Sequence, residues 1–439
     1  MKLVIAGGGY VGLATGVGFG RHGHEIELIE INPERAAQLR RGELPFHEPS
    51  LAQDLAELSG RNLTVHTGYP DSIEGADFAF ICVDTYPAED GHLDSTRVAS
   101  AAQSLIDTCG SDVPLVLRST VNPGTSVMVR EMRAERGTPG AVLMNPEFLR
   151  EGTALWDFDH PSRRVVGGND PEAVEKLVRL YDFPGGTAPV LRTDATTAEV
   201  IKMAANAALA VRVSMANEIA HIADAAGASP EAVLAAIGGD PRIGPDFLQP
   251  GIGFGGSCLP KDLSAFVAAA RRVGVPSPVF AGTESTNDFA IDRLVGRVCQ
   301  LVGVTPGTQR NGKSHGRVCV VGVGFKPGSD SVRSSQSIRL VRSLIAEGFD
   351  VGVLDPVAEA NARVELADGV SYERDFETVL GSYDVVIEVF PDSRHAQLRS
   401  PQARWIDGLG RQLGVVEAQQ DAQAPVDARA TVEVVSRHE

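Results

Sequence analysis

The chain opens with a pattern that strongly restricts how its N-terminal part can fold. Residues 2–6 (KLVIA) predict a buried strand, residues 7–12 (GGGYVG) predict a turn that opens a helix, and residues 24–30 (HEIELIE) predict a second strand. In such a turn the first glycine permits the tight bend, the second lets the backbone approach a pyrophosphate, and the third lets helix and strand pack closely. This order indicates a dinucleotide site; a glycine turn without a ligand is the alternative.

Glu30, which ends the second predicted strand, indicates the kind of dinucleotide. A carboxylate at this place can bind both ribose hydroxyls and would repel a 2′-phosphate. The preceding helix N-terminus would face the phosphates, where its dipole favours negative charge. We therefore expect NAD rather than NADP.

Strands and helices alternate through the rest of the N-terminal part. Further strands are predicted at 77–83, 113–118 and 141–144, with helical stretches between them such as 97–109. Strands that alternate with helices imply a parallel, doubly wound sheet.

Near residue 194 the pattern changes. Residues 196–226 are Ala-rich and contain no Gly or Pro, which predicts one long helix. More helix is predicted at 230–237, 261–273 and 283–301. An all-helical middle segment fits a connecting or dimerising domain.

A second α/β unit follows a polar, Gly-rich linker at 305–316. It begins with the strand RVCVVGVGF and continues with a helix at 335–347 and strands at 350–354 and 384–389. The polar tail after 415 has no assigned role.

These segments predict an α/β fold with two Rossmann-like doubly wound domains, joined by a long central helix and an all-helical middle domain. The expected boundaries are 1–195 for the NAD-binding domain, 196–304 for the helical domain and 317–439 for the second α/β domain. A length of 439 residues agrees with about three domains.

Composition excludes several classes of protein. A net charge of −17 makes nucleic acid or an anionic membrane a poor partner. The five cysteines form no CxxC pair, which argues against a zinc ribbon or a disulfide framework and fits a reducing cytoplasm. The N-terminus lacks a signal-peptide pattern, and no apolar run reaches the ~18 residues that span a bilayer. No metal is expected.

The segment 253–262 (GFGGSCLPKD) carries a candidate nucleophile, Cys258. Pro260 suits the first turn of a helix, so Cys258 lies just before a helix N-terminus with Lys261 close by. Both features favour the thiolate, which is the nucleophilic form. The alternative is a buried structural cysteine, the interpretation that we accept for the other four.

Polar residues of three further segments are candidates for the same chemistry. Lys202 and Asn206 lie four apart on one face of the long helix and could polarise a substrate oxygen, or Lys202 could simply be solvated. Glu147 and Glu151 follow a strand and could act as general acid and base, or as a solvated pair at a helix start. Thr120 also follows a strand and could hold a water or cap a helix.

Together these segments resemble the family of NAD-dependent nucleotide-sugar 6-dehydrogenases, which includes UDP-glucose and GDP-mannose dehydrogenases. The resemblance covers residues 1 to about 410. It rests on GGGYVG, LPFHEPSL (44–51), RSTVNPGT (118–125), NPEFLREGTA (145–154), the helix with Lys202 and Asn206, GFGGSCLPKD and GFKPGSDSVRSS (324–335).

The resemblance implies oxidation of the sugar C6 alcohol to a carboxylate in two hydride transfers that consume two NAD. Cys258 would capture the intermediate aldehyde as a thiohemiacetal, and the second transfer would give a thioester that water hydrolyses.

The resemblance also implies roles for single residues. Lys202 and Asn206 would stabilise the oxyanion, while Asp262 and Thr120 would position the proton-accepting water. Glu151 would assist at C6 beside the nicotinamide, and Glu147 would serve in thioester hydrolysis. The implied cofactor contacts are Gly7, Gly9, Tyr10, Val11, Gly12, Glu30, Arg35, Thr85, Ser119, Thr120, Glu151, Lys261 and Arg333.

The implied substrate contacts are Phe148, Leu149, Arg150, Lys202, Asn206, Arg242, Phe247, Gly251, Phe254, Gly255, Phe325 and Lys326. Arg242 matches an arginine that reaches the substrate pyrophosphate of a neighbouring subunit, which implies a homodimer or a higher homo-oligomer.

The substrate remains open between two sugar nucleotides. Ile406-Asp-Gly-Leu409 lacks the arginine of many UDP-specific members, and this favours GDP-mannose, as do RSTV and SCLPKD. The Pro161–Val165 run and Gly152 resemble UDP-glucose enzymes, which we rank first. Two further departures are Asp84, which adds negative charge near the pyrophosphate, and Ser329-Asp330-Ser331, where two acids are usual.

Two other classes of protein were weighed. A β-hydroxyacid dehydrogenase shares the Rossmann domain and the Lys–Asn pair but needs neither Cys258 nor a second α/β domain. A non-catalytic nucleotide-sugar sensor would be expected to lose a catalytic residue, and none is missing. Because both ligands are anionic, basic residues should gather at the cleft of this acidic chain, and the candidates are Arg150, Lys202, Arg242, Lys261, Lys326 and Arg333.

Overall fold

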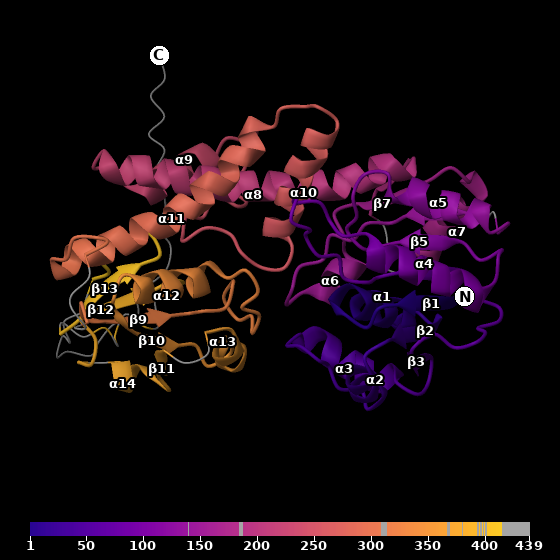
Figure 1. Ribbon diagram of the computed structural model, residues 1–439, viewed down its shortest axis with the longest axis horizontal. Helices are drawn as coiled ribbons and strands as arrows, with labels where there is room; N and C mark the ends of the chain where they lie inside the picture. Colours follow the sequence, from indigo (N-terminus) through magenta and orange to yellow (C-terminus); the bar gives the residue numbers. More distant parts are fainter. Residues whose placement is uncertain are drawn as a thin grey trace, which may run out of the picture.

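The computed structural model describes residues 1–414 except 139, 184–187, 309–313, 367–368, 380, 393–394, 396, 398 and 400–401. Two α/β bodies lie side by side below a layer of long helices, and the predicted fold class is confirmed (Figure 1). Part of the predicted linker and the tail after 415 fall outside the described residues.

The N-terminal body is built on an eight-stranded sheet of order β3-β2-β1-β4-β5-β6-β7-β8, in which only the β6–β7 pair is antiparallel. Its strands are β1 (Lys2–Ala6), β2 (Glu25–Glu30), β3 (Leu63–Thr67), β4 (Phe78–Ile81), β5 (Leu115–Leu117), β6 (Val142–Met144), β7 (Arg164–Gly168) and β8 (Val190–Thr193). Its helices are α1 (Tyr10–Arg21), α2 (Pro33–Arg40), α3 (Pro49–Leu58), α4 (Thr96–Cys109), α5 (Thr125–Glu135), α6 (Ala154–Asp159) and α7 (Pro171–Leu180).

The extent of burial explains which strands of this sheet could be predicted from the sequence. All four residues of β4 are buried, because helices cover both faces of a parallel sheet and strand residues there are apolar without alternation. The strands β3, β7 and β8 were not predicted. Two residues of β8 are exposed, and Thr64 and Thr67 of β3 face solvent, so neither strand forms an apolar run.

The central layer consists of α8 (Ala195–Ala225), α9 (Pro230–Gly238), α10 (Leu259–Arg272) and α11 (Pro278–Val302). The predicted long helix is α8, with 31 residues. Asp194 caps it by accepting the Thr197 N–H at 2.8 Å. Along α8 the buried alanines include Ala207, Ala210 and Ala216, whose small side chains let α10 and α11 pack closely.

The C-terminal body is a second parallel sheet of order β11-β10-β9-β12-β13. Its strands are β9 (Arg317–Val321), β10 (Asp350–Leu354), β11 (Val370–Tyr372), β12 (Val385–Glu388) and β13 (Arg404–Asp407), and its helices are α12 (Gln336–Ala346), α13 (Glu359–Leu366) and α14 (Phe376–Val379). In this sheet the strand order reverses direction between β9 and β12, and ligands bind at such a point in open α/β sheets. Within the described part of the chain, no helix is both long and apolar enough to cross a bilayer.

Candidate active site

A cavity of about 840 Å³ lies where the three parts of the molecule meet. Its wall includes the loop that follows β6, the middle of α8, the loop before α10, and Phe325 with Lys326 of the C-terminal body. The volume suits a ligand of several hundred daltons. The predicted candidates Glu147, Glu151, Lys202, Asn206 and Cys258 all line this one cavity.

Cys258 occupies the N-cap position of α10, with Pro260 in the first turn as predicted. It is the one exposed cysteine of the five, all of which are free. The expectation of a favoured thiolate is not met. Packing of protein around the sulfur raises the pKa of Cys258, and the nearby Asp262 and Glu147 carboxylates add to this, while Lys202 and Lys261 only partly oppose it. The thiol therefore requires a base when it reacts.

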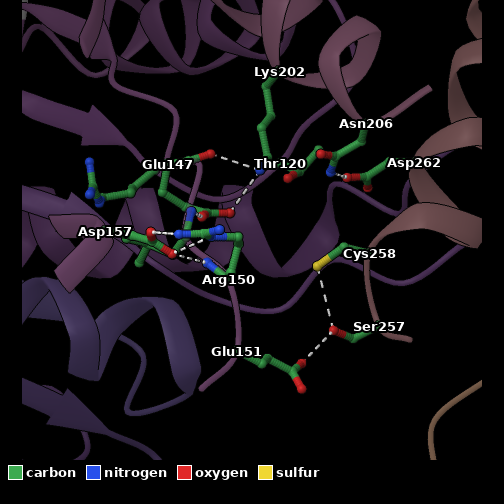
Figure 2. A network of polar contacts seen from close by, with 12 residues as sticks. Thr120, Glu147, Arg150, Glu151, Asp157, Lys202, Asn206, Ser257, Cys258 and Asp262 are labelled. Atoms are coloured by element: carbon green, nitrogen blue, oxygen red, sulfur yellow. Dashed lines mark hydrogen bonds and ion pairs between the residues drawn. The ribbon is translucent and has the colours of Figure 1, made fainter. Parts of the chain in front are cut away.

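Lys202 and Glu147 form a buried ion pair on one side of the cavity (Figure 2). Lys202 Nζ donates to Glu147 Oε1 at 2.9 Å and to the Glu147 carbonyl at 2.7 Å, and the Leu149 N–H donates to Glu147 Oε2 at 2.6 Å. Burial acts to raise the pKa of Glu147, but the Lys202 ammonium outweighs it and holds that pKa below its usual range. Burial likewise acts to lower the pKa of Lys202, and the surrounding carboxylates raise it instead.

The Lys202 interactions leave a donor for a ligand. An ammonium has three protons, and two of them are engaged. The third proton can be offered to an oxygen in the cavity. Because Lys202 is buried, the alternative of a solvated lysine is excluded.

Asn206 and Asp262 form a second buried pair one helical turn farther along α8. Asn206 Nδ2 donates to Asp262 Oδ2 at 2.5 Å, and Lys261 pairs with Asp262 Oδ1. Both carboxylate oxygens of Asp262 are thus occupied, and the carboxylate orients the Asn206 amide.

Glu151 lies on the other side of Cys258 and connects the two α/β bodies. Its carboxylate accepts hydrogen bonds from Ser257 Oγ at 3.3 Å and Ser329 Oγ at 3.5 Å, and its carbonyl accepts from Lys326 Nζ. Burial raises the pKa of Glu151, with Lys326 opposing this in part. A carboxylate with a raised pKa is suited to accept a proton near neutral pH.

The loop with Thr120 is held in place from two sides. The Thr120 carbonyl accepts the Thr85 hydroxyl at 2.8 Å, and Ser119 Oγ donates to the Val83 carbonyl at 2.6 Å. Glu199 of α8 accepts the Gly124 and Ser126 N–H groups, each at 2.6 Å, and so caps α5. Thr85 and Ser119, expected as cofactor contacts, are buried and bound to the backbone.

The glycine turn has the shape that a dinucleotide requires. A Cβ at Gly12 would lie 1.8 Å from the Gly7 carbonyl oxygen, and Gly7 itself has φ +111° and would clash with the Cys82 carbonyl. Glu30 ends β2 and accepts the Gly8 N–H at 3.2 Å and the Asn32 N–H at 2.8 Å, with Arg35 at 3.5 Å. These residues fit NAD: the glycine turn would hold its pyrophosphate, and Glu30 would hold the ribose hydroxyls.

Alanine substitutions should separate the two roles of these glycines, which are close packing of helix and strand and binding of NAD. Gly12→Ala is expected to lower the free energy of unfolding by several kcal/mol, because a clash at 1.8 Å forces α1 away from β1. Gly9→Ala has space, with its nearest neighbour at 3.9 Å, and is expected to fold normally but bind NAD about tenfold or more weakly. Urea unfolding and NAD titration test both, and equal loss of stability in the two variants would contradict this.

Glu48 is a site residue that the sequence did not single out. It is buried and its Oε2 accepts the Tyr10 hydroxyl at 2.9 Å and the Gly152 N–H, while Ser50 Oγ donates to Oε1 at 2.7 Å. The Tyr10 hydroxyl also lies 2.9 Å from the Arg150 carbonyl. Glu48 thus ties the glycine turn to the loop that carries Glu147 and Glu151. The signal available in the sequence was the position of Glu48 inside LPFHEPSL (44–51), one of the segments that carry the family resemblance.

The expected substrate contacts divide into two groups. Residues of the first group line the cavity, and they are Phe148, Leu149, Arg150, Phe247, Gly255, Phe325 and Lys326. Arg150 is held by the Asp157 carboxylate at 2.6 Å. Gly251 and Phe254 support the loop instead: the Gly251 N–H donates to Asn217 at 2.7 Å, and Phe254 is buried against α8 and α10.

Arg242 and Arg333 are not among the residues that line this cavity in the described part of the chain. The Arg242 side chain is 87% exposed and pairs with Asp240. Of the six expected basic residues, Arg150, Lys202 and Lys326 line the cavity, whereas Lys261 does not and pairs with Asp262 instead. Three further arginines line the cavity: Arg118, Arg163 and Arg164. The expectation of a basic cleft therefore holds with a partly different set of residues.

Comparisons with known proteins agree with this arrangement. Models of the UDP-glucose/GDP-mannose dehydrogenase family match residues 1–183 (NAD binding domain), 196–289 (central domain) and 319–413 (UDP binding domain). A UDP-glucose 6-dehydrogenase of Haloferax volcanii is 37% identical over 88% of this chain and 90% of its own, and one of Pseudomonas aeruginosa is 36% identical over 85% and 83%.

Among solved structures, a UDP-glucose dehydrogenase from Pyrobaculum islandicum superimposes with a TM-score of 0.86 at 33% identity, covering 93% of this chain and 94% of that chain.

Proposed function

The chain belongs to the UDP-glucose/GDP-mannose dehydrogenase family, and from this premise we propose that it oxidises UDP-glucose to UDP-glucuronate with two NAD. It is an NAD-dependent oxidoreductase of nucleotide sugars. One observation carries the proposal: a cysteine, a buried Lys–Glu pair and an asparagine held by a buried aspartate line one cavity between a dinucleotide fold and a second α/β body.

The chemistry follows from the donors around Cys258. NAD, when bound, supplies the hydride acceptor for each oxidation, and Gly7, Gly9, Gly12 and Glu30 would hold it. The free proton of Lys202 and the second N–H of Asn206 stabilise negative charge on the C6 oxygen. Cys258 bonds to the aldehyde carbon, so that the second oxidation yields a thioester that water hydrolyses. Glu147 serves that hydrolysis, and Asp262 and Thr120 position water.

UDP-glucose ranks above GDP-mannose because the quoted relatives are UDP-glucose dehydrogenases. The missing arginine of the last strand is the argument for GDP-mannose. In the structure Leu409 packs into an apolar cluster with Leu234 and Leu248, while Arg411 pairs with Asp407 and Glu231. Arg411 therefore does not take the place of that arginine in this conformation.

NADH release with UDP-glucose, GDP-mannose and UDP-N-acetylhexosamines, measured in parallel, tests the proposal. We expect UDP-glucose to be the preferred substrate and to yield two NADH per sugar. One NADH per substrate would favour a β-hydroxyacid dehydrogenase, and binding without NADH would favour a sensor. Preference for GDP-mannose would overturn the choice of nucleotide.

We also propose that Arg242 completes the cavity of a partner subunit in a homodimer or larger homo-oligomer. The Arg242 side chain does not line the cavity of its own chain, is 87% exposed and pairs only with the nearby Asp240 among the described residues, so it is accessible to another copy. The cytoplasm is the proposed location, and five free cysteines support a reducing compartment.

Arg242→Ala is expected to raise the KM for the sugar nucleotide about tenfold or more, the effect of losing a charged hydrogen bond to phosphate. The Kd for NAD should stay nearly unchanged. Steady-state kinetics and NAD titration measure the two, with Arg61→Ala at another exposed arginine as the control. Equal damage to both ligands would argue against this placement.

A further inference from the structure

A hydrogen-bonded chain leads from the thiol of Cys258 to a carboxylate of the opposite loop. Cys258 Sγ lies 3.4 Å from Ser257 Oγ, and Ser257 Oγ donates to Glu151 Oε1 at 3.3 Å (Figure 2). The Ser257 hydroxyl has one proton, so when it donates to Glu151 the thiol proton is the one that bridges sulfur and Ser257 Oγ. The three groups are thus aligned for proton transfer away from sulfur.

The other carboxylates near the sulfur are engaged elsewhere. Both oxygens of Asp262 are bound, one by Asn206 and one by Lys261. The oxygens of Glu147 bind Lys202 and the Leu149 N–H. Among the described residues, Glu151 is the carboxylate that connects to Sγ through a hydroxyl.

The charges around both ends of the chain favour a transfer that occurs only during reaction. Protein atoms packed around the sulfur raise the pKa of the thiol, which favours its protonated form at rest, and burial raises the pKa of Glu151, which strengthens it as a base. The groups that act on the two ends are Lys202, Lys261, Asp262 and Glu147 at the sulfur, and Lys326, Ser329 and Asp330 at Glu151.

We propose that Ser257 relays the proton of the Cys258 thiol to Glu151 as sulfur bonds to the C6 aldehyde carbon. The S–H bond breaks, Ser257 Oγ takes this proton and gives its own to Glu151 Oε1, and the C–S bond forms. The carbonyl electron pair moves to the C6 oxygen, which Lys202 and Asn206 hold. When hydrolysis of the thioester releases the sulfur, the same path returns the proton. The inference rests on the proposed function, because it takes Cys258 as the nucleophile.

Alkylation of Cys258 by iodoacetamide tests the relay without turnover, so its outcome is independent of substrate identity. The rate is followed by mass spectrometry of the Cys258 peptide between pH 5 and 10, since Cys109 is also partly exposed. Ser257→Ala is expected to slow alkylation at pH 7 at least about tenfold. This is a modest effect, since a positioned general base typically accelerates a reaction ~10²–10⁴-fold. The wild type and variant should converge at high pH, where the thiolate forms without help.

Glu151→Gln separates the relay from simple electrostatics. Removal of a negative charge near the sulfur would by itself favour thiolate and speed alkylation, whereas loss of the relay slows it. Ser257→Thr, which keeps the hydroxyl, should restore the rate. Ser329→Ala removes the partner on Glu151 Oε2 and the acceptor of the Ser331 N–H but leaves Ser257 in place, so it should leave the rate within about twofold. An unchanged rate in Ser257→Ala or a faster rate in Glu151→Gln would overturn the relay.

Discussion

Cys258→Ala is expected to abolish production of the sugar acid, with a loss of turnover of at least ~10³-fold, as for other enzymes that lose a nucleophile. The physical reason is that Cys258 is the one thiol among the described residues that line the cavity. Without the C–S bond, the second oxidation depends on an aldehyde hydrate that no covalent bond holds in place. The Lys202 and Asn206 donors remain, so the first oxidation should be slowed far less.

The measurement is the number of NADH formed per sugar, together with product analysis. The wild type should give two NADH and the carboxylate. The variant should give a single slow turnover at most, with the aldehyde detectable by a carbonyl trap. Cys258→Ser serves as a fold control because serine is a preferred N-cap residue for α10. Cys109→Ala controls for loss of a partly exposed thiol elsewhere. Full activity without the Cys258 sulfur would contradict the mechanism.

The sequence predicted those elements whose residues form a uniform run. The strands β1, β4 and β5 show as apolar runs because almost all of their residues are buried, and α8 shows as an Ala-rich run without Gly or Pro, although only one part of its surface is buried. Strand β8 could not be recognised because half of it faces solvent. Its place beside β7 is set by tertiary pairing rather than by local pattern.

The residues of the site could be predicted from the sequence, but the contacts that they make with one another could not. Motif order identified Lys202 and Glu147, yet only the fold shows that they form one buried ion pair across 55 positions of sequence. The thiolate expectation for Cys258 was wrong because helix position and one lysine are visible in the sequence, whereas the packing of protein atoms around the sulfur and the approach of Glu147 from another segment are not. Ser257 was overlooked although it lies next to the nucleophile, since its link to Glu151 spans 106 positions.

Lys202→Met is the second substitution with a large expected effect, and it acts on both activity and stability. Turnover should fall about 10²–10³-fold, the usual effect of removing one donor to a developing oxyanion. The free energy of unfolding should fall by about 3–5 kcal/mol, because Glu147 is left as a buried carboxylate without its partner.

The two effects separate in the double variant. Lys202→Met with Glu147→Gln removes the uncompensated charge, so most of the lost stability should return. The activity should not return, since the donor to the C6 oxygen is still missing. Urea unfolding and single-turnover NADH formation measure the two properties. Recovery of activity in the double variant would show that Lys202 acts only by holding Glu147.

The pH dependence of stability gives an independent check on the pairing of Lys202 with Glu147, because the contribution of Glu147 should change with pH in opposite directions in the wild type and in Lys202→Met. In the wild type the folded-state pKa of Glu147 lies below its usual value, so its contribution is present above the unfolded pKa of about 4.3 and is lost as pH falls. In Lys202→Met burial is no longer opposed, and the pKa of Glu147 should rise above that value. The variant is then penalised at neutral pH and should recover stability relative to the wild type as the pH falls from neutral toward the unfolded pKa of about 4.3. A constant difference between the two proteins over this range would mean that Glu147 is not the group left unpaired.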